Sequence, residues 1–198
     1  MRGGCSLVIL AGGLSRRMGR DKAALPAGEG TLIEHLARRL APVVDETIIA
    51  GGSAGQNLPG VTAVDDRYPG LGPLAGIHAG LLAARFPLVW VVGCDLPDVD
   101  PGLAALLCGL AGDVDAVVPR IDSEPQGVCA VYDRALAPRI DRLLAAGERR
   151  VKMLLAASKV RYVTPEELRA VDPELRSFRN INTPADYRAW ITTQPASP

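Results

Sequence analysis

Short apolar runs alternate with longer amphipathic stretches along most of the chain. Six runs have the length and near-continuous apolar character of buried parallel strands, at residues 5–11, 47–50, 61–64, 88–92, 116–118 and 128–132. Strands that alternate with helices in this way join by right-handed crossovers into a sheet with helices on both sides. We therefore predict an α/β, three-layer, Rossmann-like fold with a mostly parallel central sheet.

Helical periodicity fills the intervals between the apolar runs. The clearest helix begins at Thr31, because "TLIE" places Glu34 at the third helical position and so has the form of a capping box. The last helix covers residues 183–191, with Thr183 as cap and Pro184 as first residue. Four more helices are expected from about residue 73, near residue 101, over 134–146 with a break at Pro138, and over 151–157. Ligands bind such sheets beyond the carboxyl ends of the strands, which places the loops after residues 10, 64 and 92 at the functional edge.

The length and composition fit one ordinary globular domain. The chain has 198 residues, of which 48% are hydrophobic, and we assign residues 1–191 to one domain and residues 192–198 to a disordered tail. The 22 basic residues balance the 22 acidic ones, so the overall charge gives no sign of a nucleic-acid or membrane-surface partner. No apolar run reaches the roughly 18 residues of a membrane span. Any anion-binding site must therefore be local.

The cysteines and histidines do not have the spacing of a zinc site. No CxxC pair occurs, and neither His35 nor His78 is placed to complete a ligand set. The first apolar run is too short for a signal peptide and leads into two glycines. We expect a cytoplasmic protein with reduced thiols. These thiols are those of Cys5, Cys94, Cys108 and Cys129.

The stretch "LVILAGGLSRRMGRDKAAL", residues 7–25, combines a strand end with glycines and clustered positive charge. Gly12 and Gly13 let backbone N–H groups approach an anion closely, because no side chain blocks the way. Arg16, Arg17 and Lys22 add positive charge that an anion would compensate. Neither the Walker pattern nor GxGxxG fits the glycine spacing. A polyphosphate is the expected ligand, and a solvated glycine loop with surface charges is the alternative.

A second stretch, "PLVWVVGCDLPDV", ends an apolar strand in a carboxylate. The strand delivers Asp95 to the ligand edge of the sheet, facing the glycine loop. Magnesium prefers one or two carboxylates together with phosphate oxygens and water, so Asp95 is the candidate magnesium ligand. Asp98 and Asp100 follow closely, and we interpret them as helix caps rather than as ligands.

Other polar groups are less specific. Asp65 and Asp66 follow the third strand, where they either wall a base pocket or form a turn. The stretch "GERRVKML" clusters basic side chains, and "RNINTPADY" sets two asparagines on one side of an extended segment, but both patterns are common for structural reasons. No nucleophile elbow and no HExxH helix occurs. The chain therefore offers no obvious covalent nucleophile.

The motifs "LAGGLSRRMGRDKAAL", "YPGLGPLAGI", "GCDLP", "AGERRV" and "NINTPADY" occur in the order and spacing of a known family. The chain resembles the MobA-like molybdenum cofactor guanylyltransferases of the nucleotidyltransferase superfamily, from residue 7 to about residue 190. The resemblance implies the nucleotidyltransferase version of the predicted fold. It also implies Mg²⁺-dependent transfer of GMP from GTP to the phosphate of Mo-molybdopterin, with release of pyrophosphate. Its partners would be these substrates, with transient contacts to cofactor-delivery and acceptor proteins.

The resemblance assigns roles to individual residues. Lys22 and Asp95, with Arg16 and Arg17, would form the catalytic set. The residues implied for GTP binding are Leu10, Ala11, Gly12, Gly13, Lys22, Asp65 or Asp66, and Asp95, of which Asp95 also holds the metal. The residues implied for molybdopterin binding are Arg149, Lys152, Asn180 and Asn182. One departure is "IIAGGS", residues 48–53, which lacks the asparagine that some relatives carry after the second strand.

The chemistry expected from these residues agrees with the resemblance. A phosphate monoester is already a competent nucleophile near neutral pH, so the protein need only align it with the α-phosphorus and stabilise the departing pyrophosphate. The sequence "LAGG", where CTP-using relatives typically read "LAAG", leaves room for a purine and favours guanine. The alternatives are a sister transferase that uses CTP or a sugar-phosphate acceptor and a non-catalytic nucleotide-binding protein of the same fold. An NAD-dependent oxidoreductase is disfavoured by the missing fingerprint.

Overall fold

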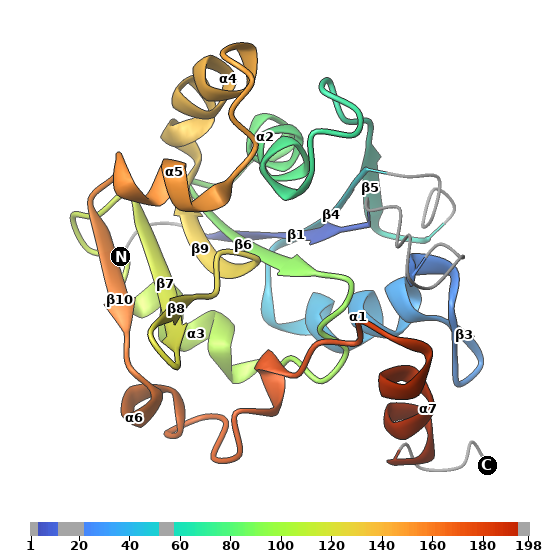
Figure 1. The fold of residues 1–198 in the computed structure, drawn as a ribbon. Coiled ribbons are helices and arrows are strands. Elements are labelled where there is room, and N and C mark those ends of the chain that lie inside the picture. Colours follow the sequence, from blue (N-terminus) through green and yellow to red (C-terminus); the bar gives the residue numbers. More distant parts are fainter. Residues whose placement is uncertain (1–3, 12–21, 52–57, 194–198) are drawn as a thin grey trace.

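The computed structural model describes residues 4–11, 22–51 and 58–193, which form a central sheet between two layers of helices (Figure 1). Along β1 (Cys5–Leu10), Leu7 and Ile9 pack on one face of the sheet and Val8 and Leu10 on the other. Helices α1 (Leu32–Leu40) and α3 (Gly102–Gly109) cover the first face, and α2 (Pro73–Ala83), α4 (Ala137–Ala145) and α5 (Val151–Ala156) cover the second. The predicted three-layer α/β fold is confirmed.

Within the described residues, the central sheet has eight strands in the order β10-β7-β9-β6-β1-β4-β5, with β8 paired to β7. Parallel pairs join β1 to β4 and β6, β4 to β5, and β10 to β7, whereas β9 is antiparallel to both β6 and β7. The run at residues 128–132 therefore does not fit the parallel expectation, because the chain returns from β7 through β8 over too few residues for a parallel crossover. The strand bounds are β4 (Glu46–Ala50), β5 (Val61–Val64), β6 (Leu88–Gly93), β7 (Ala116–Ile121), β8 (Glu124–Pro125), β9 (Cys129–Asp133) and β10 (Val160–Val163).

Two helices start at the caps that the sequence predicts. Thr31 Oγ1 accepts a hydrogen bond from the Glu34 N–H at 3.4 Å, and Glu34 Oε2 accepts one from the Thr31 N–H at 2.7 Å, so the capping box of α1 is confirmed. At the start of α7 (Pro184–Thr193), Thr183 Oγ1 accepts from the Asp186 N–H at 3.1 Å. Helix α7 runs through Thr193 rather than ending at residue 191.

The predicted break at Pro138 lies at a helix start instead. A single 3₁₀ turn, η3 (Arg134–Leu136), precedes α4, and Pro138 lies in the first turn of α4, where its missing N–H costs no intrahelical hydrogen bond. The apolar pattern also left several short elements without a prediction. They are η1 (Lys22–Ala24), β2 (Pro26–Ala27), β3 (Gly30–Thr31), η2 (Ala41–Val43), β8, β10, α6 (Pro165–Leu168) and η4 (Arg176–Phe178).

Helix α2 lies against β1 because glycines face the strand. A Cβ on Gly80 would lie 2.5 Å from Val8 Cγ1, and a Cβ on Gly76 would lie 3.0 Å from Leu10 Cδ2. Both distances are shorter than a packed core tolerates without a shift. The close approach fixes α2, and the turn that leads into it, beside the carboxyl end of β1.

The cysteines all lie in the described part of the chain and form no disulfide. Cys94 and Cys129 are buried, whereas Cys5 and Cys108 are half-buried with their Sγ atoms 3.3 Å apart. Among the described residues, no helix has the length and apolar character needed to cross a membrane.

Candidate active site

The carboxyl ends of β1, β4 and β6 meet at one edge of the sheet. Leu10, the last residue of β1, pairs with Gly93 of β6 on one side and with Ala50 of β4 on the other. Beyond the strands, the Cys94 N–H donates to the Leu10 carbonyl at 3.1 Å, and the Ala11 N–H donates to the Ala50 carbonyl at 2.9 Å. The segments that follow β1 and β6 therefore leave the sheet side by side, as the sequence predicts for the functional edge.

Three side chains from distant parts of the chain meet beyond this edge. Lys22 Nζ donates a hydrogen bond to Asn182 Oδ1 at 2.9 Å and lies 3.9 Å from Asp95 Oδ2. The Ile181 N–H donates to the carbonyl oxygen of Asp95 at 2.8 Å, which ties the segment before α7 to the loop after β6. The structure thus brings together three of the residues that the sequence singles out, from η1, the β6 loop and the α7 segment.

The Lys22–Asp95 pair is largely withdrawn from solvent. The side chains are 14% and 25% exposed, respectively. Burial raises the pKa of the Asp95 carboxyl, while the positive charge of Lys22 opposes that increase. The net direction shows that one ammonium group does not fully offset the desolvation of this carboxylate.

A glycine lets the Asp95 carboxylate lie over the end of its strand. A Cβ at Gly93 would approach Asp95 Oδ1 to 2.6 Å, so a larger residue would displace the carboxyl group. The Leu96 N–H donates to the Gly93 carbonyl at 3.1 Å and closes the turn. The motif "GCDLP" therefore holds a carboxylate at a defined place on the ligand edge.

The structure gives separate roles to Asp98 and Asp100. Asp100 Oδ1 accepts from the Gly102 N–H at 2.7 Å; Asp100 lies one residue before Pro101, the N-cap of α3, so its carboxylate satisfies an N–H of the first helical turn. Asp98 Oδ1 instead accepts from Trp190 Nε1 at 2.9 Å. The interpretation of Asp98 as a cap is therefore wrong, because a tertiary contact with α7 takes its carboxylate.

Asp65 and Asp66 lie directly after β5, at the same edge of the sheet. Asp66 Oδ1 accepts from the Tyr68 N–H at 2.8 Å, which forms the turn that was one of the two interpretations. Asp65 is exposed. The assignment of either carboxylate to the nucleotide stays a prediction.

Part of the predicted phosphate loop lies outside the described residues. These are Gly12, Gly13, Arg16 and Arg17. Leu10 and Ala11, which are also predicted to contact the nucleotide through their backbone, lie within the described residues and are buried. The Ala11 N–H already donates to the Ala50 carbonyl of β4. Nucleotide contacts of this loop therefore stay predictions.

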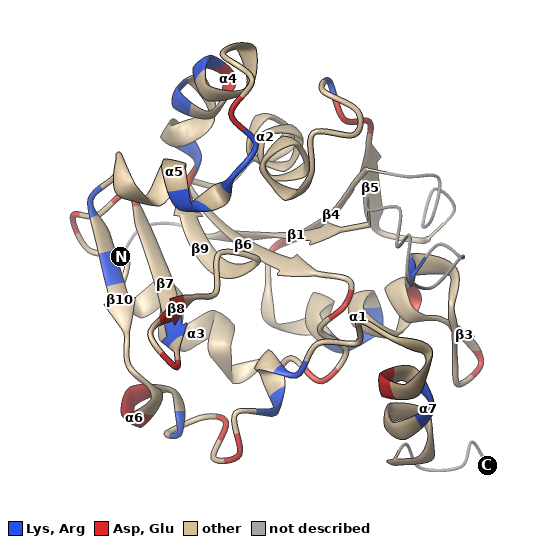
Figure 2. Cartoon of the chain, viewed as in Figure 1, with Lys and Arg blue, Asp and Glu red and all other residues tan. Residues whose placement is uncertain are grey.

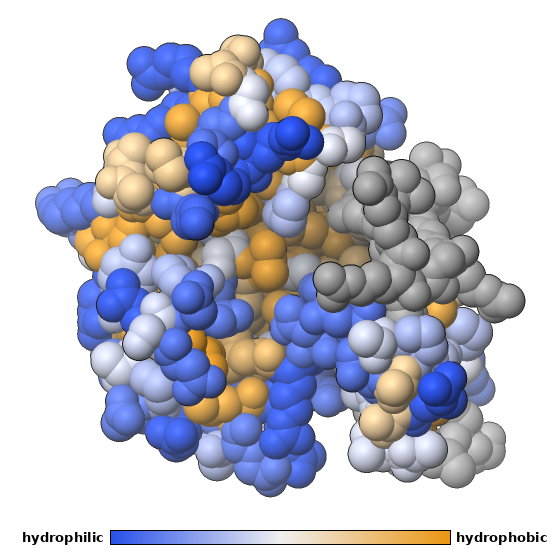
Figure 3. Space-filling view, in the orientation of Figure 1, coloured by the Kyte–Doolittle hydropathy of each residue, from blue (hydrophilic) through white to orange (hydrophobic). Residues whose placement is uncertain are grey.

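The residues predicted for the pterin flank the edge from two sides. Arg149, just before α5, and Lys152, within α5, are both exposed. Helix α5 packs on the α2 face of the sheet, and Figure 2 shows basic residues gathered there. Asn180, also exposed, precedes α7, which packs against Leu32 of α1. Figure 3 shows the middle of this face hollowed, with apolar residues at its floor and hydrophilic residues along its rims. The structure brings Asn182 to Lys22 but leaves the pterin assignments as predictions.

Neither histidine is placed as a catalytic base. His35 Nε2 lies 3.1 Å from the Pro97 carbonyl oxygen, and burial lowers the pKa of this imidazole, so it is a neutral hydrogen-bond donor near pH 7. His78 is 1% exposed in α2, and burial also lowers its pKa, although Asp141 at 3.6 Å opposes the decrease. Both histidines are packing residues.

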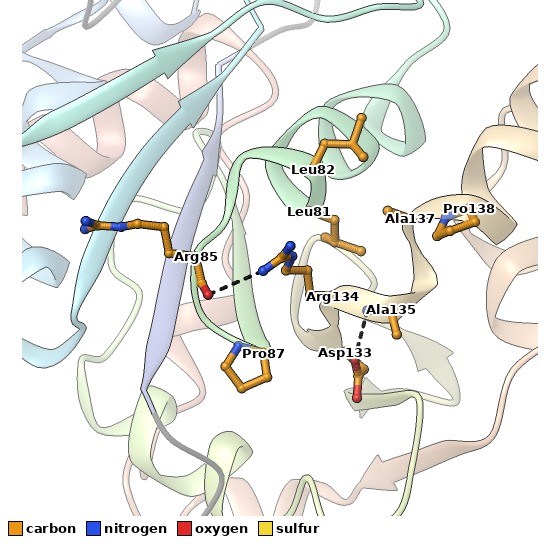
Figure 4. Close-up of a pocket in the computed structure, with 9 residues that line it drawn as sticks. All are labelled: Leu81, Leu82, Arg85, Pro87, Asp133, Arg134, Ala135, Ala137 and Pro138. Carbon is orange, nitrogen blue, oxygen red and sulfur yellow. Dashed lines mark hydrogen bonds between the residues drawn. The ribbon is translucent and has the colours of Figure 1, made fainter.

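A pocket of about 620 Å³ opens at the opposite, amino-terminal edge of the strands. Leu81 and Leu82 of α2 and Pro138 of α4 give it an apolar wall, and Arg134 reaches across to the Arg85 carbonyl (Figure 4). It shares no lining residue with the Lys22–Asp95 edge.

The sequence left Trp190 and Tyr187 without a role. Trp190 is buried and contacts both Asp98 and His35, and the Tyr187 hydroxyl donates to the Pro26 carbonyl at 2.6 Å. In the sequence, these two residues stand out only as aromatic side chains at helical spacing, in a helix without a strong apolar face. Such a pattern does not identify a contact with the active site.

Comparison with known proteins identifies what the chain is similar to. The profile of the MobA-like NTP transferase domain matches residues 7–162. A protein of Pelotomaculum thermopropionicum named "Probable molybdenum cofactor guanylyltransferase" is 40% identical over 90% of this chain and 88% of its own length. The "Molybdenum cofactor guanylyltransferase" of Desulfosudis oleivorans is 35% identical over 89% of each chain.

Solved structures show the same similarity. The crystal structure of molybdopterin-guanine dinucleotide biosynthesis protein A from Archaeoglobus fulgidus has a TM-score of 0.80 and 30% identity, and covers 93% of this chain and 95% of its own. The 2-C-methyl-D-erythritol 4-phosphate cytidylyltransferase from Thermus thermophilus covers 93% of this chain and 96% of its own, with a TM-score of 0.67 at 20% identity, which shows a shared fold only.

Proposed function

The chain belongs to the MobA-like NTP transferase family, and we propose that it transfers GMP from GTP to the phosphate of Mo-molybdopterin and releases pyrophosphate. The observation that carries this proposal is the meeting of Lys22, Asp95 and Asn182 at the carboxyl edge of the sheet. The names of the relatives, which are guanylyltransferases of the molybdenum cofactor, supply the nucleotide and the acceptor.

Each residue of the site has a role in phosphoryl-group chemistry. The ammonium group of Lys22, 14% exposed, binds phosphate oxygens and stabilises the negative charge that grows on the departing pyrophosphate. The partial burial of the Lys22–Asp95 pair lowers the effective dielectric around it, which strengthens such interactions. The acceptor phosphate needs no activation by a covalent nucleophile, so alignment at the α-phosphorus is the main task of the protein.

The site fits a magnesium ion. The carboxylate of Asp95 offers the hard oxygen ligand that magnesium prefers. Burial raises the pKa of this carboxyl group, and a bound cation would favour its ionised form. Within the described residues, no three metal-binding side chains gather, so Asp95 would hold the ion together with phosphate oxygens and water, as magnesium prefers. When bound, the ion supplies charge neutralisation on the triphosphate.

The setting of the reaction follows from the same chemistry. We place the protein in the cytoplasm, where thiols stay reduced, in line with four cysteines that form no disulfide. The acceptor is a cofactor that other proteins make and receive, so transient contacts with those proteins are part of the proposal.

The test is a product assay with a choice of nucleotides. Purified protein is incubated with Mo-molybdopterin, MgCl₂ and GTP, CTP or ATP, and pyrophosphate and the dinucleotide product are measured by chromatography. We expect pyrophosphate and molybdopterin guanine dinucleotide with GTP. A product formed with CTP instead would assign the chain to the sister activity, and GTP binding without pyrophosphate release would make it a non-catalytic member.

A matched pair of lysine variants links the activity to the site. Lys22→Ala should lower turnover on the order of 100-fold to 1000-fold, by analogy with the loss of other transition-state donors. Lys159→Ala is the control, because Lys159 Nζ pairs with Asp113 at 2.8 Å beside β10 and is 65% exposed. Equal turnover in the two variants would refute the role of Lys22.

A further inference from the structure

Helix α7 and the segment before it lie beyond residues 7–162, which match the family profile, yet they contact both loops that carry the candidate catalytic pair. Figure 1 shows α7 beside the β2–β3 hairpin on the α1 side of the molecule. The contacts of α7 fall into two sets, one on the Asp95 loop and one on the Lys22 segment.

The first set holds the loop after β6 at three points. The Ile181 N–H binds the Asp95 carbonyl at 2.8 Å. Trp190 Nε1 donates to Asp98 Oδ1 at 2.9 Å. The Trp190 ring also meets His35 edge-on, with centroids 5.4 Å apart, and His35 Nε2 lies 3.1 Å from the Pro97 carbonyl. The indole is only 7% exposed and its hydrogen bond to Asp98 is part-buried, so loss of that hydrogen bond leaves a polar group poorly satisfied.

The second set holds the segment that begins at Lys22. The Tyr187 hydroxyl donates to the Pro26 carbonyl at 2.6 Å, and Trp190 packs with Leu25 and Leu32 in a small apolar cluster. Lys22 Nζ itself donates to Asn182 Oδ1 at 2.9 Å. One helix therefore fixes the segment that carries the ammonium group as well as the loop that carries the carboxylate.

The start of α7 orients Asn182. Asp186 Oδ2 accepts from the Asn182 N–H at 3.0 Å and from the Thr183 N–H at 2.8 Å, and Thr183 Oγ1 accepts from the Asp186 N–H. These reciprocal bonds set the backbone from which the Asn182 amide reaches Lys22.

We propose that α7 is a positioning element of the active site, in which Trp190 and Tyr187 fix the separation between Lys22 and Asp95. The inference rests on the proposed function for its catalytic consequence. Misplacement of reacting groups by about 1 Å can cost on the order of 100-fold in rate, so a helix that ties the two loops together affects turnover without touching substrate.

The test compares Trp190→Phe and Tyr187→Phe with a control on the same helix. Trp190→Phe keeps an aromatic ring in the cluster and removes the N–H donated to Asp98; Tyr187→Phe removes the hydroxyl donated to Pro26. Thr192→Ala is the control, because Thr192 is exposed and its hydroxyl donates to the Ala189 carbonyl within α7. We expect Trp190→Phe to lower kcat about 10-fold, to change KM for GTP less than about threefold, and to require more Mg²⁺, with Tyr187→Phe weaker in the same direction.

Asp98 provides a conservative rescue. Asp98→Asn keeps an oxygen acceptor for the Trp190 N–H and should retain most of the turnover that Asp98→Ala loses. The turnover of the double variant with Trp190→Phe and Asp98→Ala should be no lower than that of the more impaired single variant, because both substitutions remove the same hydrogen bond. Additive losses would contradict a role through this hydrogen bond.

Hydrogen exchange separates the failure of this inference from that of the proposed function. In Trp190→Phe, amide exchange should increase in residues 22–27 and 94–99 and stay unchanged in α2, and this readout does not depend on any reaction. If the wild-type protein transfers GMP and Trp190→Phe matches it in kcat, with faster exchange confined to α7, the positioning role is overturned and the function stands. If the wild-type protein transfers nothing, the function fails, and unchanged exchange in the two loops would overturn the positioning role as well.

Discussion

Replacement of Asp95 by Asn removes a charge and keeps the size of the side chain. The carboxylate is 25% exposed and lies 3.9 Å from Lys22 Nζ, and burial raises its pKa despite that ammonium group. The ionised form is thus less favourable in the folded protein than in the unfolded chain. A neutral amide avoids this cost, and Lys22 keeps its hydrogen bond to Asn182.

The variant should separate function from stability. Loss of the metal ligand should lower turnover on the order of 100-fold to 1000-fold, which is about 3 to 4 kcal/mol of transition-state stabilisation. The free energy of unfolding should fall by less than about 1 kcal/mol or rise, so that Tm falls by no more than about 4 °C for a chain of this size. Residues that serve activity at the expense of stability behave in this way.

The pH dependence gives the sign of the effect. The pKa of Asp95 is raised in the folded state, so the folded protein binds this proton more tightly than the unfolded chain does. The resulting contribution to stability is fully present at acidic pH, below the pKa of the unfolded chain, and is lost as the pH rises through the raised pKa. Without magnesium, the Tm of Asp95→Asn relative to wild type should therefore increase as the pH rises from the ordinary carboxyl range towards neutrality.

Two assays on the same preparation decide the matter. Pyrophosphate release is measured against Mg²⁺ concentration, and Tm is measured by calorimetry with and without the metal. A fall in Tm of more than about 8 °C in Asp95→Asn would mean that Asp95 holds the fold. Unchanged turnover with the same Mg²⁺ dependence would refute its role as metal ligand.

Further outcomes follow from packing and titration. Gly80→Ala should lower stability by about 1 to 3 kcal/mol, because its Cβ would meet Val8 Cγ1 at 2.5 Å; Gly109→Ala, with open space around its Cβ, should raise stability by up to about 1 kcal/mol, and denaturant unfolding checks both. The pKa of His35 is lowered from its ordinary 6.5 by burial, so its contribution to stability is present above that pH and is lost as the pH falls below it. His35→Phe should accordingly flatten the fall in Tm between about pH 7.5 and about pH 5, and an unchanged slope would refute this.

The sequence predicts the central strands well, because buried strands are continuous apolar runs. It also predicts the capping box of α1, because this motif needs only residues three apart, as Thr31 and Glu34 are. Strand β10 was missed because it contains Arg161 and Tyr162, both half-buried, so its four residues do not form an apolar run. The antiparallel direction of β9 depends on how the chain returns from β7, which hydrophobicity does not record.

The candidate site divides in the same way. Asp95 follows closely on Gly93, the last residue of β6, and Lys22 ends a stretch rich in glycine and arginine, and local sequence shows both features. The contact between Lys22 and Asn182 spans 160 positions, and the one between Asp98 and Trp190 spans 92. Such contacts depend on the packed fold and leave no local sequence pattern. Sequence reasoning therefore interpreted Asp98 as a helix cap and assigned no role to Trp190.

The most direct measurement is the position of the metal and the nucleotide in a crystal grown with GTP and Mn²⁺ in place of Mg²⁺. The anomalous signal of manganese should lie at the Asp95 carboxylate, with the triphosphate beside Lys22 and the guanine towards the end of β5. A nucleotide bound away from this edge, for example in the pocket formed by Leu81 and Arg134, or a metal with no contact to Asp95, would contradict the account.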